Sequence, residues 1–171
     1  GTGSTDNAAF TITGSSLTIN ASPNFEAQAS YSIRVRVTDS GSPAQSLDKT
    51  FTITVVDVND QPTGLSLSAS SIAENAAPAA RAIGNFSTSD PDLPAQTLTY
   101  TLVSGPGSTD NTSFSITGST LSIKAAPDFE TRSSYIIRVR VSDSGSPAAY
   151  FEKAFTITVT NVIEPPLVAT F

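Results

Sequence analysis

Apolar residues alternate with polar ones along almost the whole chain, the period of two that is typical of strands with one buried face. Clusters of Gly, Pro, Asp and Ser separate the alternating segments. Seven strands are predicted in the second part of the chain, at residues 65–67, 82–86, 98–102, 114–116, 121–123, 135–141 and 155–159. Roughly 100 residues with seven such strands is the size of an immunoglobulin-like β-sandwich, so we predict an all-β fold of that type.

The alternation also predicts which side chains face the core. In the segment 135–141, Tyr135, Ile137, Val139 and Val141 are expected to point inward, and the two arginines between them are expected to face water. The aromatic residues fall almost entirely on inward positions and are therefore expected in the core. Tyr150 is the exception, because a serine stands at the matching position of the repeat described next.

The chain contains an internal repeat with a constant offset of 104 residues. Residues 1–62 align without a gap to residues 105–166, and 38 of these 62 pairs are identical. We therefore predict tandem repeats: the C-terminal part of one repeat plus a linker at 1–62, a complete repeat at 63–166, and a tail or the start of a next module at 167–171. Either the sequence was cut from a longer array, or another chain supplies the strands that the first repeat lacks.

Composition narrows the chemistry that the chain can perform. It has no Cys, His, Trp or Met, which excludes Cys or His zinc sites, Cys or His nucleophiles and Ser-His-Asp triads. The remaining ligands are oxygen atoms, which favour calcium or magnesium. The net charge of −6 argues against nucleic acid and anionic lipid as partners, and no apolar run is long enough to insert into a membrane.

Oxygen-bearing side chains gather in short clusters on this otherwise charge-poor chain. Each cluster alone is explained by a turn, since Asp-Pro and Asp-Ser-Gly are common turn formers. The clusters follow one another in the order Asp57-Val58-Asn59-Asp60, Glu74, Asp90 with Asp92, Asp128 with Glu130, and Asp143.

This ordered set of motifs resembles that of a cadherin repeat, of the kind also found in bacterial surface proteins. The resemblance covers essentially the whole chain. It implies a cadherin-type sandwich and calcium ions bound where one repeat is linked to the next. The ligands that it implies for this inter-repeat site are Glu26, Asn59, Asp60, the carbonyl of Gln61, Asp90, Asp92 and Asp143.

The sequence departs from the family pattern at several positions. Asn24 replaces the Asp expected two residues before Glu26, which weakens one ligand position. The second linker reads TNVIEPP, where Glu164 stands in place of Asp60. The resemblance therefore implies only a weaker distal half site, formed by Glu74, Asp128, Glu130 and Glu164.

The function that follows is a non-enzymatic, calcium-rigidified module of an extracellular or cell-surface adhesin or stalk. Its expected partners are neighbouring repeats of the same chain or homophilic copies, with a cell-surface protein or a polysaccharide as further candidates. One alternative is a carbohydrate-binding module that uses the exposed Tyr150. Another is a filament subunit completed by strand exchange between chains. Paired carboxylates could also serve as the catalytic acids of a glycosidase, but the cadherin resemblance already implies that each of them is a calcium ligand.

Overall fold

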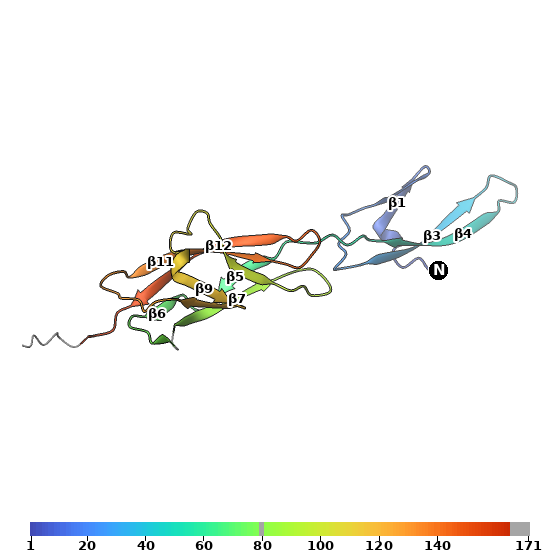
Figure 1. The fold of residues 1–171 in the computed structure, drawn as a ribbon. Coiled ribbons are helices and arrows are strands. Elements are labelled where there is room, and N and C mark those ends of the chain that lie inside the picture. Colours follow the sequence, from blue (N-terminus) through green and yellow to red (C-terminus); the bar gives the residue numbers. More distant parts are fainter. Residues whose placement is uncertain (79–80, 165–171) are drawn as a thin grey trace, which may run out of the picture. The chain divides into compact units, whose positions relative to one another are not determined.

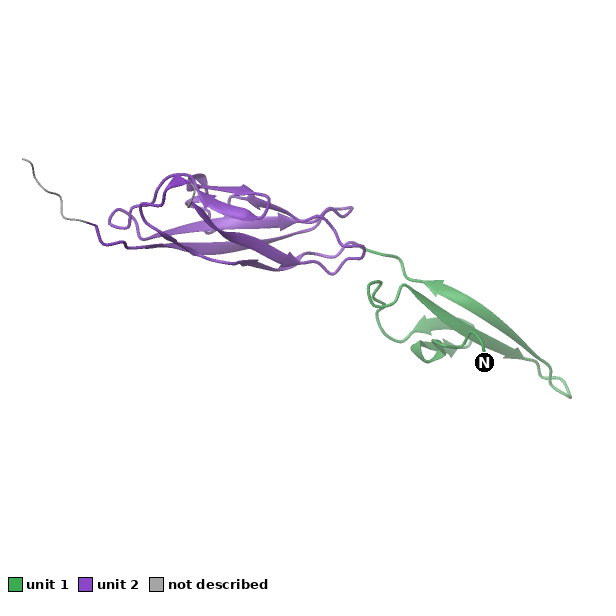
Figure 2. Ribbon diagram, turned by 90° about the horizontal axis from the view of Figure 1, so that it is seen from below, with its two compact units in different colours: residues 1–58 green, residues 59–171 purple. Residues whose placement is uncertain are grey.

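The fold was analysed in a computed structural model that describes residues 1–78 and 81–164. The chain divides into two compact units, unit 1 (Gly1–Val58) and unit 2 (Asn59–Phe171), which are shown in different colours in Figure 2. The predicted tail at 167–171 lies outside the described residues. None of the described helices is long and apolar enough to cross a membrane.

Unit 2 consists of two four-stranded sheets (Figure 1). One sheet has the strand order β5 (Thr63–Leu67), β7 (Ala82–Ser89), β10 (Thr120–Ile123) and β9 (Phe114–Thr117). The other has the order β6 (Ser71–Ala73), β12 (Tyr150–Thr160), β11 (Ser134–Ser142) and β8 (Thr99–Leu102). A short 3₁₀ helix, η3 (Asn111–Ser113), precedes β9. All pairs are antiparallel except β6 with β12, which is parallel.

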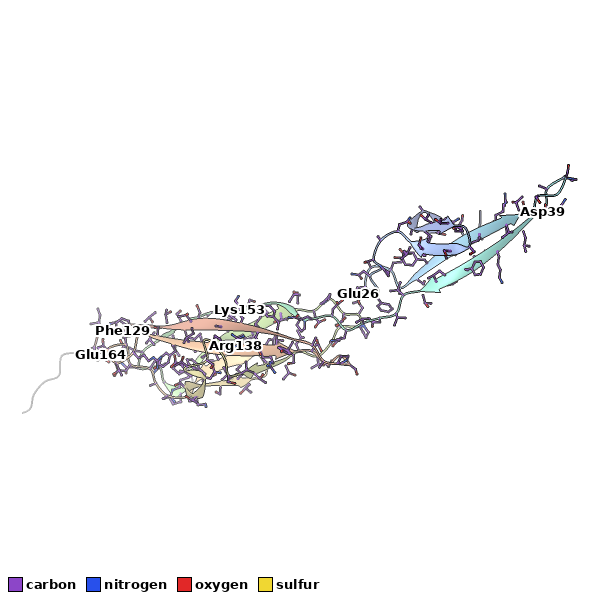
Figure 3. The ribbon with its side chains drawn as sticks, turned by 90° about the horizontal axis from the view of Figure 1, so that it is seen from above. Glu26, Asp39, Phe129, Arg138, Lys153 and Glu164 are labelled. Carbon is purple, nitrogen blue, oxygen red and sulfur yellow. The ribbon has the colours of Figure 1, made fainter. Side chains whose placement is uncertain are left out.

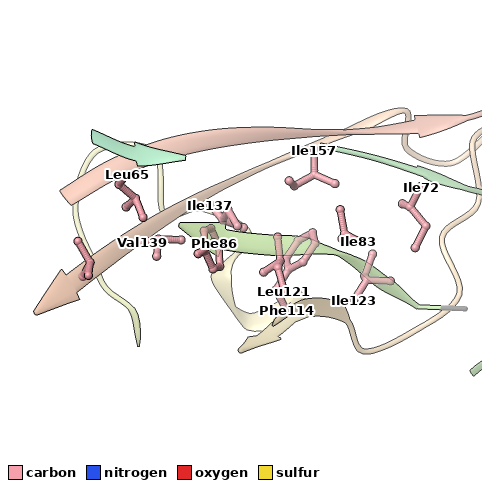
Figure 4. Close-up of a cluster of buried hydrophobic side chains, with 11 residues drawn as sticks. Leu65, Ile72, Ile83, Phe86, Phe114, Leu121, Ile123, Ile137, Val139 and Ile157 are labelled. Atoms are coloured by element: carbon pink, nitrogen blue, oxygen red, sulfur yellow. The ribbon is translucent and has the colours of Figure 1, made fainter. Parts of the chain in front are cut away.

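The inward-facing residues of both sheets form one core, as the alternation predicts (Figure 4). Ile137, Val139 and Val141 of β11 are fully buried. The core cluster comprises Leu65, Ile72, Ile83, Phe86, Phe114, Leu121, Ile123, Ile137, Val139, Val141 and Ile157. The predicted all-β sandwich is thus confirmed for unit 2.

The outward face of β11 carries the two arginines that the sequence places there. Both guanidinium groups bind one carboxylate on β12, with Arg138 at 2.7 Å and Arg140 at 2.6 Å from Glu152. The two hydrogen-bonded arginines lower the pKa of Glu152. The arginines are only half-exposed, because the ion pairs and the neighbouring strands cover part of each side chain.

Unit 1 consists of two hairpins and a short 3₁₀ helix, η1 (Asn7–Ala9). The strands β1 (Phe10–Thr13) and β2 (Ser16–Ile19) form one hairpin, and β3 (Ser30–Thr38) and β4 (Ser46–Thr54) form the other. Their registers equal those of β9–β10 and β11–β12 after the offset of 104 residues. The internal repeat is therefore a repeat of structure as well as of sequence.

The structure adds one strand to the seven predicted for the second part of the chain and lengthens another. β6 was not predicted, because its three residues offer a single inward apolar side chain, Ile72, and its pairing with β12 joins positions 87 residues apart. β12 begins at Tyr150 rather than at residue 155, because it pairs along the whole of β11.

Candidate metal sites

Six residues meet at the end of unit 2 where β7 and β11 terminate. We call them the N-terminal cluster: Asn59, Asp60, Asp90, Asp92, Gln96 and Asp143. Asp90 and Asp92 follow directly after β7, and Asp143 follows directly after β11. β7 belongs to one sheet and β11 to the other, so the packing of the two sheets brings the loops after these strands to one end of the sandwich, and residues far apart in the sequence become neighbours.

Turn hydrogen bonds account for part of the cluster. The N–H of Asp92 donates to Asp90 Oδ1 at 3.1 Å, which closes the loop after β7. The N–H groups of Gly145 and Ala149 donate to Asp143 Oδ1 at 3.0 and 2.9 Å, which closes the β11–β12 loop. Burial alone would raise the pKa of Asp143, but these N–H groups lower it.

Asn59 and Asp60 tie the first residues of unit 2 to these loops. Asn59 Nδ2 donates to Asp143 Oδ2 at 3.2 Å, and the N–H of Asp60 donates to Asp92 Oδ1 at 3.0 Å. A Cβ atom at Gly145 would collide with the Asn59 side chain, so Asn59 packs directly on the β11–β12 loop. The Asp60 side chain and Gln61 are exposed.

Gln96 is a member of the cluster that the sequence analysis missed. Its Nε2 donates to Asn59 Oδ1 at 2.6 Å and to Asp92 Oδ2 at 2.7 Å. One positively polarised group thus holds two oxygen atoms together, as a bound cation would. No motif distinguishes this glutamine in its loop, and only its position beside Asn59 in space reveals the connection.

Two oxygen atoms of the N-terminal cluster have no hydrogen-bond partner among the described residues. They are Asp90 Oδ2 and Gln96 Oε1, and both are buried. A buried acceptor without a donor is costly unless a cation or water satisfies it. The cluster therefore offers carboxylate and amide oxygens, two of them unsatisfied, which is the ligand chemistry that suits Ca²⁺.

The unsatisfied carboxylate of Asp90 predicts that removing its negative charge stabilises the chain when no cation is bound. Burial and the negative charges of Asp92 and Asp143 raise the pKa of Asp90, although the N–H of Asp92 opposes the shift. A group whose pKa is raised by folding stabilises the fold when protonated, and this contribution is lost as the pH rises through the folded-state pKa. In chelator at pH 7, Asp90→Asn should therefore raise the Tm by on the order of a few degrees.

The pH profile provides the control for this prediction. The Tm difference between Asp90→Asn and the parent chain should shrink toward zero as the pH falls below about 4, where the parent carboxyl is protonated as well. Differential scanning fluorimetry in chelator between pH 3.5 and 8 measures both curves. A variant less stable than the parent at pH 7 in chelator would contradict this account of Asp90.

A second group of acidic residues, the C-terminal cluster, lies where β6 and β12 end. It comprises Glu74, Asp128, Glu130 and Glu164. Carboxylate oxygens of Glu74, Asp128 and Glu130 lie within 4.8 Å of one another. Glu164 lies beside this group of three, and its Oε1 accepts a hydrogen bond of 2.5 Å from Asn75 Nδ2. Figure 3 labels Phe129 and Glu164 at this end of unit 2.

Backbone donors hold the central carboxylate of the C-terminal cluster. Glu74 is buried, and it accepts hydrogen bonds from the N–H of Val162 at 2.6 Å and the N–H of Phe129 at 2.9 Å. These bonds lower the pKa of Glu74. The backbone N–H of Glu130 lowers the pKa of the Glu130 carboxyl. Burial and the negative charge of Glu74 raise this pKa, and the net shift is upward. The cluster concentrates negative charge that a divalent cation would neutralise.

The remaining residues singled out in the sequence lie elsewhere. Glu26 belongs to unit 1, where it follows β2, and Asp57 also lies in unit 1. Tyr150 is 51% exposed, as predicted, but the Arg140 guanidinium lies over its ring at 4.1 Å. One face of this aromatic ring is therefore covered, which leaves less of it for stacking on a sugar.

The model of the cadherin domain matches residues 69–160, which is more than half of the chain. The chain belongs to the cadherin family. The matched residues contain most of unit 2, and they include Glu74 and both loops that carry Asp90, Asp92 and Asp143.

Relatives of this cadherin chain include animal cadherins and protocadherins. It is 31% identical to mouse Cadherin-24, in an alignment that covers 85% of this chain and 21% of that protein. It is 32% identical to mouse Protocadherin Fat 4, in an alignment that covers 96% of this chain and 3% of that protein. It therefore spans a small part of these relatives. The extracellular domain of Protocadherin GammaB4 has a TM-score of 0.61 at 29% identity, over 88% of this chain and 26% of the other. Protocadherin Gamma B2 extracellular cadherin domains 1–5 have a TM-score of 0.69 at 23% identity, over 91% of this chain and 32% of the other.

Proposed function

We propose that this chain is a non-enzymatic, calcium-binding module of an extracellular adhesive protein or surface stalk. In this proposal Ca²⁺ binds at the linker between repeats and restrains the two units relative to each other. The observation that carries the proposal is the pair of oxygen clusters on unit 2, one with two unsatisfied buried oxygens and one with three converging carboxylates. Membership of the cadherin family supports it.

The two clusters lie at opposite ends of unit 2. Asp128 and Glu130 precede the first residue of β11, and Asp143 follows its last. The nine residues of β11 span about 30 Å as an extended strand. A module with a cation site at each end suits a linear array of repeats, since each ion can be shared with the next repeat along the chain.

The residues of the N-terminal cluster are arranged to receive an ion. Asp92, Asp90 and Asp143 supply carboxylate oxygens, and Asn59 supplies an amide oxygen. The proposed ligand set also includes Glu26, Asp60 and the carbonyl of Gln61. A bound Ca²⁺ would replace the repulsion between these carboxylates by attraction. The C-terminal cluster, with Glu74, Asp128, Glu130 and Glu164, is the proposed distal half site.

Partners and location follow from the family and remain part of the proposal. We expect an extracellular or cell-surface position, with neighbouring repeats or homophilic copies as the main partners. One structural relative, Protocadherin gammaB7, is described as a cis-dimer of its domains EC3–6. A cell-surface protein or a polysaccharide is a further candidate partner.

Calorimetric titration of the chain with CaCl₂ tests the proposal directly. We expect saturable binding with dissociation constants of about 10⁻⁴ to 10⁻³ M, the range of extracellular calcium modules. Asp92→Asn should remove the binding events of the N-terminal cluster, and Asp128→Asn should weaken those of the C-terminal cluster. Glu152→Gln is the matched control, because Glu152 is an ion-paired carboxylate that lies in neither cluster.

The outcomes separate calcium binding from simple turn chemistry. If the double variant Asp92→Asn/Asp128→Asn binds calcium as the parent chain does, the ions bind outside the two clusters. An absence of binding at 10-fold excess over about 10⁻³ M would mean that both clusters serve only to close turns.

A further inference from the structure

Gln96 belongs to the N-terminal cluster, but neither the sequence motifs nor the proposed ligand set includes it. It stands in the connection between β7 and β8, four residues after Asp92. The N–H of the next residue, Thr97, donates to Ser144 Oγ at 3.1 Å. Ser144 directly follows Asp143 in the β11–β12 loop, so the backbone beside Gln96 is held against the loop that carries this aspartate.

The NH₂ group of the Gln96 side chain is fully engaged. Nε2 donates one hydrogen bond to Asn59 Oδ1 at 2.6 Å and one to Asp92 Oδ2 at 2.7 Å, as many as the nitrogen has protons. Asn59 in turn donates through Nδ2 to Asp143 Oδ2 at 3.2 Å. Two side-chain amides thus connect the carboxylates of Asp92 and Asp143, and these bonds fix the orientation of the Gln96 amide.

The oxygen of the same amide has no such partner. Gln96 is half-buried as a residue, but its Oε1 is completely buried and finds no hydrogen-bond donor among residues 1–78 and 81–164. Rotating the amide about its Cγ–Cδ bond would bring no relief, because Oε1 would then face the carboxylate of Asp92 in place of Nε2. A buried acceptor without a partner is costly, so this oxygen calls for a ligand that the described side chains do not supply.

The charges around this oxygen favour a cation over a water molecule. Three carboxyl groups, those of Asp90, Asp92 and Asp143, belong to the same cluster. The ion pairs found in the described part of the chain all use other carboxylates. Within that part, only the partial charges of amide and backbone N–H groups oppose the negative charge of the cluster, and a divalent cation would do so more strongly.

We propose that Gln96 is a further ligand of the calcium site in the N-terminal cluster, which it binds through Oε1 while its NH₂ group positions Asn59 and Asp92. This inference rests on the proposed function. Ca²⁺ takes six to eight oxygen atoms, and carbonyl oxygens of Asn and Gln are among its usual ligands. Calcium affinity is tuned by the number of charged ligands. A neutral oxygen therefore completes the shell and keeps the site in the weak range expected of extracellular modules.

Carbon-13 NMR of the intact chain tests the contact directly. The chain has four glutamines, Gln28, Gln45, Gln61 and Gln96, so selective ¹³C labelling of their side-chain carbonyls gives a simple spectrum. A cation polarises the carbonyl that it binds. The Gln96 ¹³Cδ signal should therefore move downfield as CaCl₂ is added, with the midpoint of the binding that Asp92→Asn removes. Gln45 is the matched control, since it is exposed in the β3–β4 loop and belongs to neither cluster, and its signal should stay in place.

Two substitutions separate a ligand from a residue that only positions its neighbours. Gln96→Met removes the oxygen and the NH₂ group, and calorimetry should show calcium binding at the N-terminal cluster weakened by at least about tenfold. Gln96→Glu removes the NH₂ group but keeps an oxygen at the same reach and adds a charge. It should tighten calcium binding by at least about fivefold. It should also lower the Tm in chelator by on the order of a few degrees, because a further carboxylate then faces Asp92.

The proposal fails if the Gln96 ¹³Cδ signal stays in place while calcium fills the N-terminal cluster. It also fails if Gln96→Glu weakens binding as Gln96→Met does, since the amide would then serve only as a cross-link between Asn59 and Asp92. Tighter binding by Gln96→Met would show that the amide competes with the ion, which overturns the proposal as well. A failure of the proposed function looks different, because the parent chain itself would then show no calcium binding that Asp92→Asn removes, and that result overturns both.

Discussion

Truncation of Leu121 to alanine is expected to lower the free energy of unfolding of unit 2 by about 2–5 kcal/mol, the usual cost of such a change in a closed core. Leu121 is fully buried between the sheets, and its cross-strand partners Gly84 and Ile116 lie in the paired strands β7 and β9. A cavity left there cannot collapse without moving β7 or β9. Urea denaturation monitored by far-ultraviolet circular dichroism and by amide exchange in β11 measures the loss.

Leu17 is the matched control within the same molecule. It occupies the same register in β2, but its side chain is partly in water, so Leu17→Ala should cost less than about 1 kcal/mol. Equal costs at the two positions would show that Leu17 is as fully covered in solution as Leu121. A small cost at Leu121 would contradict the tight packing of the core of unit 2.

Calcium is expected to raise the unfolding temperature of the chain strongly. An ion at about 100 times its dissociation constant stabilises the folded state by roughly 2.7 kcal/mol, if it binds only that state. For a module of about 100 residues this is an upward shift of very roughly 10–20 °C between excess chelator and excess calcium. Thermal unfolding followed by circular dichroism under the two conditions provides the measurement.

The variant Asp92→Ala should lose most of this shift. It removes a carboxylate of the N-terminal cluster that accepts hydrogen bonds from the N–H of Asp60 and from Gln96. The variant should also melt somewhat lower in chelator, because both donors lose their partner. Glu152→Gln should keep the full calcium shift, and a shift of equal size in Asp92→Ala would remove that residue from the site.

Most of the fold could be predicted from the sequence, because period-two alternation is a local signal. β11, with Ile137, Val139 and Val141 inward, needed no long-range information. β6 could not be predicted, because a three-residue strand carries almost no pattern and is defined by its pairing with β12.

The candidate sites were accessible to sequence reasoning only in part. Asp90, Asp92 and Asp143 stand in recognisable motifs, and the structure does bring them to one end of unit 2. Gln96 was missed, because the sequence does not show that its amide lies between Asn59 and Asp92. The exposure of Val37 cannot be read from the alternation of β3, which is the same as that of β11, and follows only from the comparison of the two repeats.

The parallel pairing of β6 with β12 bears on how unit 2 responds to a pulling force. β6 lies near the beginning of unit 2, and β12 is the last strand before Glu164. Tension applied through the two ends would slide these strands past each other along their length. Because the pairs Ser71–Thr158, Ile72–Val159 and Ala73–Thr160 are then loaded together, they must break together rather than one after another. Under such a force, the short strand β6 would therefore act as a clamp loaded in shear against β12.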